Sequence, residues 1–257
     1  MARHPRNWRW TMLVAVLAGA GAWTGAMAAP PAVDPAGIAA LGRVGAALRA
    51  QGHFFVTSDA SIEIVLDSGQ KIETGQAIRY RVQQPGRLRV DLENDGYQRQ
   101  VFFGDRKLTV WAPRKQYYAT VDVEADTLRQ LVGNAATKYD LELPLSDLFL
   151  WGTDAAPSSA ITSALRVGDE TIGNDTVEHW ALRQPGVDWQ VWISKESSLP
   201  RKLVITSLGD PALPEFSATL EWDTKTPIAD SVFAFQPPAG ASRIVMAPAV
   251  AAATEGQ

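Results

Sequence analysis

The sequence contains no cysteine among its 257 residues. This absence excludes disulfides, thiol nucleophiles and thiolate metal sites, and it excludes the lipidated N-terminal cysteine of a bacterial lipoprotein. Histidine is almost as scarce, with three in the chain. Because histidine is the usual base beside a nucleophile and a common zinc ligand, this scarcity argues against both a hydrolytic enzyme and a zinc protein.

A surplus of basic residues is also missing. The chain has 24 lysines and arginines against 28 aspartates and glutamates, a formal net charge of −4. Proteins that bind nucleic acid or anionic membranes usually carry a basic surface, so neither is expected as the main partner.

The sequence has no phosphate-binding glycine loop, dinucleotide fingerprint or nucleophile elbow. We therefore predict no cofactor, no metal and no enzymatic activity.

The first 28 residues have the pattern of a secretory signal. Three arginines lie within the first nine residues, an apolar run covers residues 10–23, and Ala26-Met27-Ala28 offers small residues at the positions that a signal peptidase reads. The pattern predicts cleavage after Ala28 and a soluble periplasmic protein without a stable membrane span. An uncleaved anchor is the alternative, although the glycine-containing run is barely long enough to cross about 30 Å of hydrocarbon.

Three stretches of the mature sequence have helical features. Asp34 is a suitable N-cap before Pro35, and apolar residues then recur on one face until about Gly52. A second helical stretch of two helices is predicted over residues 125–151, since both carry an apolar stripe that needs a partner surface. A weak third helix is predicted around residues 158–164.

Strand patterns flank the helices of residues 125–151. Apolar and polar residues alternate from about residue 53 to 123, best over 87–93, where leucine and valine face one way and charged residues the other. Turn signals at regular distances, such as Pro85-Gly86 and Asn94-Asp95-Gly96, predict an antiparallel meander. Further strands are predicted over residues 166–171, 176–184, 188–194, 201–207 and 217–223.

This order of strands, helices and strands predicts a mainly β (α+β) fold in a single domain over residues 33–244. We expect one curved antiparallel sheet of roughly ten strands that forms an unclosed β-barrel. The helices of residues 125–151 are expected to pack on its concave face. Residues 245–257 lack periodicity and are predicted to be a disordered tail.

Large apolar side chains outnumber groups with catalytic chemistry in the mature chain. Six tryptophans follow residue 29, and in the strand over 188–194 the alternation places Trp189 and Trp192 on opposite faces. A bent sheet with helices over it can enclose an apolar cavity, the usual form of a small-ligand site. The alternative is a fully packed core. The residues predicted to line the cavity are Ile64, Ile78, Tyr80, Val90, Leu128, Leu131, Leu148, Phe149, Trp189, Val191, Ile205 and Leu220.

Four blocks resemble, in order and spacing, a bacterial family of predicted periplasmic proteins of unknown function. They are VLDSGQKI (65–72), LELPLSDLF (141–149), RQPGVDWQVWI (183–193) and LPRKLVIT (199–206). The family is in turn distantly similar to the outer-membrane lipoprotein carriers and localisation factors and to periplasmic envelope-stress regulators. The resemblance implies an unclosed antiparallel barrel whose concave face holds helices and an apolar cavity for acyl chains.

These observations favour an exported protein that binds a hydrophobic ligand, either a lipid or the acyl chain of a lipoprotein, between sheet and helices. One alternative is a periplasmic protein-interaction or envelope-stress regulatory module without lipid transport, whose partners are other envelope proteins. Another is an uncharacterised enzyme, in which Asp188 or Arg201 would be the first residues to test.

Overall fold

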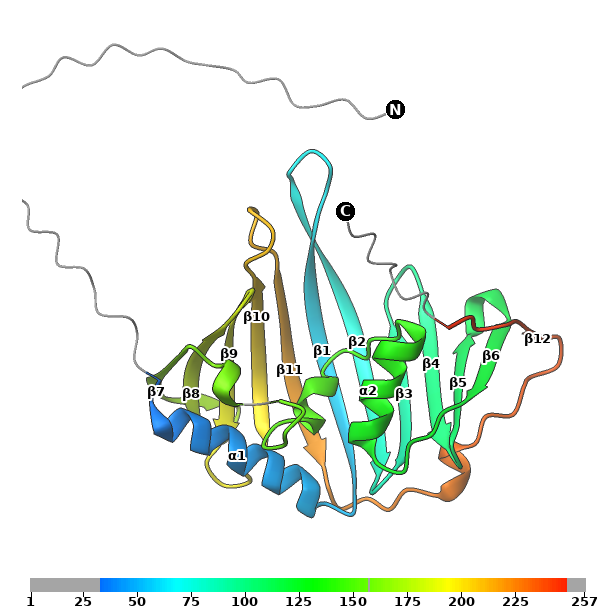
Figure 1. The fold of residues 1–257 in the computed structure, drawn as a ribbon, viewed down its shortest axis with the longest axis horizontal. Coiled ribbons are helices and arrows are strands. Elements are labelled where there is room, and N and C mark those ends of the chain that lie inside the picture. The colour runs from blue at the N-terminus through cyan, green and yellow to red at the C-terminus, as the bar shows by residue number, and fades with distance from the viewer. Residues whose placement is uncertain (1–32, 157, 249–257) are drawn as a thin grey trace, which may run out of the picture. The chain divides into compact units, whose positions relative to one another are not determined.

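The computed structural model describes residues 33–156 and 158–248, and within them one twelve-stranded sheet carries the fold (Figure 1). The strand order across the sheet is β12-β6-β5-β4-β3-β2-β1-β11-β10-β9-β8-β7. The strands are β1 (His53–Val65), β2 (Lys71–Gln83), β3 (Arg87–Glu93), β4 (Gln98–Gly104), β5 (Lys107–Ala112), β6 (Tyr117–Asp122), β7 (Ser163–Ile172), β8 (Asp175–Gln184), β9 (Val187–Ser194), β10 (Pro200–Ser207), β11 (Glu215–Asp223) and β12 (Ser242–Arg243).

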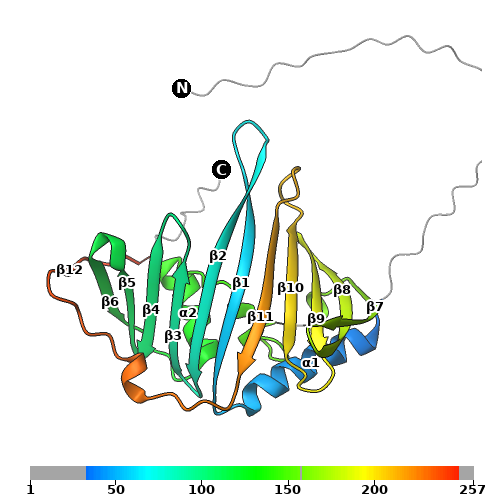
Figure 2. The same ribbon diagram turned by 180° about the vertical axis from the view of Figure 1, so that it is seen from behind.

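Two α-helices and four short 3-10 turns complete the described part. They are α1 (Pro35–Ala50), α2 (Leu128–Tyr139), η1 (Pro113–Lys115), η2 (Ser146–Phe149), η3 (Ser158–Ala160) and η4 (Asp230–Phe233). Both α-helices lie on the same side of the sheet, as Figures 1 and 2 show from opposite directions. We call this side the helix-covered face and the other side the outer face.

The mainly β fold with an unclosed sheet is confirmed. Strands β1 to β6 form one antiparallel meander, β7 to β11 form a second, and β1 joins them by pairing with β11. The edges, β7 and β12, do not pair with each other. Two details differ from the prediction, since the sheet has twelve strands rather than roughly ten, and β12 pairs with β6 in parallel.

Helix α1 follows its prediction closely. The side chain of Asp34 accepts a hydrogen bond from the backbone N–H of Ala36 at 2.8 Å, and Pro35 opens the first turn. Gly45 allows a close approach on the buried side of the helix, because a methyl group there would lie 1.9 Å from the carbonyl oxygen of Trp151. This contact holds α1 against the segment that follows η2.

The helical stretch over residues 125–151 is shorter than predicted. Helix α2 ends at Tyr139, because the next residue, Asp140, adopts a left-handed conformation with φ of 52°. Pro144 and the left-handed Leu145 (φ 67°) then reduce the second expected helix to η2. The predicted helix at 158–164 is also wrong beyond η3, since β7 begins at Ser163 and pairs with β8.

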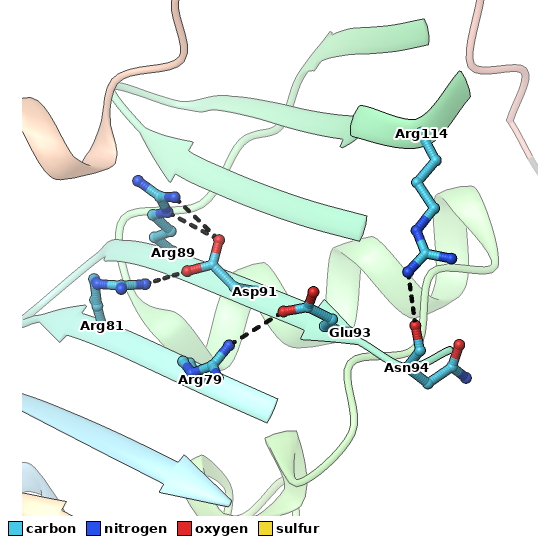
Figure 3. Close-up of polar contacts among 7 residues, drawn as sticks. All are labelled: Arg79, Arg81, Arg89, Asp91, Glu93, Asn94 and Arg114. Atoms are coloured by element: carbon cyan, nitrogen blue, oxygen red, sulfur yellow. Dashed lines mark hydrogen bonds and ion pairs between the residues drawn. The ribbon is translucent and has the colours of Figure 1, made fainter. Parts of the chain in front are cut away.

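The outer face of β2 and β3 carries the charged residues that alternate with the core. The Asp91 carboxylate pairs with Arg81 and accepts hydrogen bonds from Arg89 at 3.1 Å (Figure 3). Arg79 pairs with Glu93 at 3.5 Å. The predicted alternation over residues 87–93 is confirmed, with Leu88, Val90 and Leu92 buried on the opposite face.

After β11 the chain returns across the outer face as a C-terminal strap (residues 224–243). Phe235 anchors the strap, with ring centroids 5.3 Å from Phe102, 5.7 Å from Trp111 and 5.1 Å from Tyr118. The strap ends in β12 on the edge of β6.

The predicted signal segment 1–28 and residues 249–257 of the predicted tail lie outside the described residues, and residues 245–248 belong to no helix or strand.

The main core lies between the helix-covered face and helix α2. Leu131, on the buried side of α2, has no exposed surface. Replacing Leu131 with Trp is expected to lower the free energy of unfolding by about 1–3 kcal/mol, because a packed interior has no room for the larger ring. Urea unfolding measures this change.

The control is Lys138→Trp, at an exposed position of the same helix. This variant is expected to unfold within about 0.5 kcal/mol of the wild type. A Leu131→Trp protein as stable as the wild type would mean that space remains beneath α2.

Candidate ligand-binding cavity

An open cavity of about 710 Å³ lies between α1, residues 147–156 and 158–161, and the strands β8 to β10 on the helix-covered face. Its volume falls in the range of roughly 300–1,000 Å³ that is typical of small-molecule sites. The lining is mostly apolar. Its apolar side chains belong to Ile38, Leu41, Leu150, Trp151, Ala155, Ala156, Ala160, Ile161, Val187, Trp189, Leu203 and Ile205.

The sheet side of the cavity follows from strand register. Trp189 of β9 stands directly opposite Ile205 of β10, and Val191 stands opposite Leu203. Because residues two apart on a strand share a face, β9 and β10 present these side chains together. Trp192 faces the other way and stacks on His179 with ring centroids 3.9 Å apart, which confirms that Trp189 and Trp192 lie on opposite faces.

Two tryptophans of the cavity lining contact each other. The rings of Trp151 and Trp189 lie 5.4 Å apart, and each side chain is 8% exposed. The indole N–H of Trp189 is buried and has no hydrogen-bond partner among the described residues. A buried donor without an acceptor costs about 1–3 kcal/mol.

The side of the cavity opposite the sheet is irregular chain. Gly152 adopts φ of 71°, a conformation that favours glycine, and it lies close to Gly42 of α1. The guanidinium of Arg49 donates to the carbonyl oxygen of Trp151 at 2.9 Å and fixes this segment to α1. The cavity is therefore bounded by regular sheet on one side and by a glycine-containing loop on the other.

The polar lining residues include two aspartates and no lysine, arginine or histidine. Asp154 pairs with Arg129, whereas the Asp147 carboxylate takes part in no ion pair or side-chain hydrogen bond within the described chain. Asp147 is accessible to solvent, yet desolvation by the chain around it raises the pKa of its carboxyl above the ordinary value. Near it, burial raises the pKa of the Tyr80 hydroxyl, with the negative charge of Asp147 as a second cause.

The structure does not bring all twelve predicted residues to one cavity. Trp189 and Ile205 line it. Phe149 is partly buried against Phe54 and Tyr80. Eight others are 3% exposed or less and belong to the packed core: Ile78, Tyr80, Val90, Leu128, Leu131, Leu148, Val191 and Leu220.

Ile64 is the clearest correction. It is 43% exposed, near the end of the β1–β2 hairpin, where no helix covers the sheet. Ile64 continues the face of Phe54 and Val56, so the predicted alternation is right, but the strand extends beyond the core. Alternation identifies the face of a residue and not whether another element covers that face.

Sequence reasoning missed most of the loop residues that line the cavity. Ile38 and Leu41 belong to the apolar face of the predicted first helix, so a signal for them was present. Leu203 shares strand parity with Ile205, and the same alternation points to it. Leu150, Ala155 and Ile161 belong to no helix or strand in the structure, although the sequence predicts helix at Leu150 and Ile161, and their position depends on tertiary contacts.

The candidate catalytic groups lie outside the cavity. Both ring nitrogens of His179 are engaged, by Glu170 at 2.7 Å and Gln190 at 3.0 Å. Asp188 is paired with Arg183, which lowers the pKa of Asp188, and Arg201 lies 3.4 Å from Asp175. Across residues 33–156 and 158–248, no three metal-ligating side chains gather into a metal site.

Residues 37–247 match the sequence profile of a protein family that is described as "Predicted periplasmic protein (DUF2092)". The chain belongs to this family of predicted periplasmic proteins. Comparison with curated proteins gives no match. None of the helices in the described part of the chain has the length and hydrophobicity to span a membrane.

Several solved structures resemble the chain distantly. An uncharacterized conserved protein from Thermus thermophilus has 10% identity and a TM-score of 0.48, with 80% of this chain and 97% of that one covered. MucB, in the Pseudomonas aeruginosa MucA/MucB complex, has 16% identity, a TM-score of 0.43 and coverage of 78%, and this chain spans 61% of its length. A LolA superfamily protein from Nitrosomonas europaea has 9% identity and a TM-score of 0.35, with 77% and 97% covered. All three TM-scores are below 0.5, so these likenesses assign neither a fold nor a site.

Replacing Asp147 with Asn is expected to raise the free energy of unfolding at neutral pH. Below the ordinary pKa of 3.8 the carboxyl is neutral in both the folded and the unfolded chain and costs nothing. As pH rises through the window between 3.8 and the higher pKa of the folded state, the wild type loses stability relative to the variant.

Urea unfolding of both proteins over a pH series tests this dependence. The gain of Asp147→Asn is expected to grow with pH and then to level off. Asp154→Asn serves as the control, because that side chain is 83% exposed and paired with Arg129. A gain for Asp147→Asn that does not change with pH would contradict the assignment.

Proposed function

We propose that this protein binds a hydrophobic ligand, a lipid or the acyl chain of a lipoprotein, in the cavity between α1, residues 147–156 and 158–161, and the sheet. One observation carries the proposal: an open cavity of about 710 Å³ has a mostly apolar lining in which Trp151 and Trp189 face each other. Water in such a cavity gains little from its walls. An alkyl chain that replaces this water removes its own apolar surface from solvent as well.

Binding, rather than catalysis, agrees with the polar groups of the cavity. Thr153, Ser158 and Ser159 are its hydroxyl residues, and no histidine lies beside them in the lining. A hydroxyl needs an adjacent base to act as a nucleophile. We therefore propose a role without chemistry at this site.

Export through the N-terminal segment completes the proposal, and the match to a predicted periplasmic family supports it. The arginine-rich start, the apolar run and Ala26-Met27-Ala28 favour cleavage after Ala28, which releases residues 33–244 as one exported domain. Mass spectrometry of the periplasmic fraction is expected to find a mature chain that begins at Ala29. An intact Met1 in the membrane fraction would support a retained anchor instead.

Affinity for alkyl ligands is expected to rise with chain length. Each methylene group transferred from water contributes about 0.8 kcal/mol, which corresponds to about fourfold in the dissociation constant. Titration of a series of n-alkyl alcohols, followed by tryptophan fluorescence, measures the trend. The affinity is expected to stop rising when the cavity is full, and an affinity that does not depend on chain length would contradict the proposal.

Ile205→Trp provides the matched competitor, because this residue lines the cavity from β10. The added ring is expected to occupy ligand space and weaken binding of the longest alcohol most, while unfolding changes by less than about 1 kcal/mol. Ile64→Trp is the control, since Ile64 is exposed on the β1–β2 hairpin. Binding by that variant is expected to equal the wild type.

A protein-interaction function is the second candidate, and one surface favours it. Ile62, Ile64, Leu66 and Ile72 are each 39–43% exposed at the end of the β1–β2 hairpin. Gathered apolar side chains on a surface are typical of protein contacts. The variant Ile64→Lys distinguishes the two functions, because it places a charge on this hairpin. The charge would prevent protein docking and leave alkyl binding in the cavity unchanged.

A further inference from the structure

One carboxylate of the cavity has no partner for its charge. Asp147 lies on η2, is accessible from solvent, and meets no cation or hydrogen-bond donor at its carboxylate among the described residues. The other acidic residue of the lining, Asp154, is paired with Arg129. Two aspartates of one cavity therefore differ in their availability to a ligand.

Three arginines of neighbouring elements are already occupied. On α1, Arg49 donates to the Trp151 carbonyl and Arg43 pairs with Glu178 of β8. Arg129 of α2 is held by Asp154. A ligand group next to Asp147 would thus meet a negative charge without a nearby cation to offset it.

A second polar group of the cavity wall, the indole N–H of Trp189, also has no partner within the described chain, but this atom is buried and a ligand in the cavity does not reach it. The Trp189 side chain is 8% exposed, and its indole N–H can only donate. The carboxylate of Asp147, when ionised, can only accept. The polar end of a ligand that satisfies Asp147 is therefore a hydrogen-bond donor, attached to an apolar chain.

We propose, on the basis of the function proposed above, that Asp147 selects amphiphiles with a cationic, ammonium-type polar end over amphiphiles with a carboxylate or phosphate. An ammonium group would form a charge-assisted hydrogen bond with the carboxylate, whereas an anion would be repelled. A neutral hydroxyl end falls between the two. Desolvation by the surrounding chain also raises the pKa of the Asp147 carboxyl.

Three probes of equal chain length test this selectivity. Dodecylamine, dodecanol and dodecanoate are titrated at neutral pH, below their micelle concentrations, with fluorescence of the tryptophans as the readout. The wild type is expected to bind the amine about tenfold more tightly than the carboxylate, a ratio that corresponds to about 1.4 kcal/mol. Dodecanol is expected to be intermediate.

Asp147→Asn is expected to remove this preference, so that dodecylamine and dodecanoate bind with similar affinity. The control is Asp154→Asn, which lines the same cavity and removes the same formal charge, and it is expected to keep the preference. An equal loss in both variants would mean that the overall charge of the protein sets the order, which would overturn the role of Asp147.

The outcomes for the wild type distinguish the two proposals. If dodecanoate binds as tightly as dodecylamine, the selectivity is wrong and the hydrophobic-ligand function stands. If none of the three probes binds, the function itself is wrong. If Asp147→Asn does not fold, Asp147→Ser takes its place. The order of the affinities of the wild type for the three probes still tests the selectivity.

Discussion

The pairing of β1 with β11 joins parts of the chain that are far apart in sequence. Eight residue pairs form this ladder, from Phe55 opposite Asp223 to Ile62 opposite Phe216. The hydroxyls of Ser61 and Ser217 add a contact at 3.1 Å across 156 residues. Without this ladder the two meanders would be separate sheets, each with half of the core. The helix-covered face is continuous because β1 and β11 are neighbours.

The same register determines which side chains reach the core and which reach the cavity. Near the centre of the sheet, α2 and η2 cover residues such as Tyr80 and Val90, and the interior is packed. Over β9 and β10 the cover is α1 and irregular chain, and Trp189 and Ile205 face the open cavity. The difference lies in the covering elements, since the strands present apolar residues equally in both places.

Sequence reasoning recovered what local patterns determine. Alternation identified the buried face at residues 87–93, and the cap at Asp34 located the first helix, because each depends on neighbouring residues alone. It overestimated helix after Tyr139, where the left-handed Asp140 and Leu145 change the chain direction. The position of the cavity was not accessible in this way, because it depends on how a segment without periodicity packs against α1.

The C-terminal strap has a consequence for how the sheet meets other molecules. Ser242 donates its N–H to the carbonyl of Gln116 at 2.8 Å, and Ile244 donates to Tyr118 at 2.8 Å. These bonds occupy the carbonyls of Gln116, just before β6, and of Tyr118 in β6, which would otherwise be a template for strand addition by another chain. At the opposite edge, a bulge between Arg166 and Gly168 interrupts the regular ladder of β7. The strap thus covers the start of the β6 edge, where a strand of another molecule could otherwise pair.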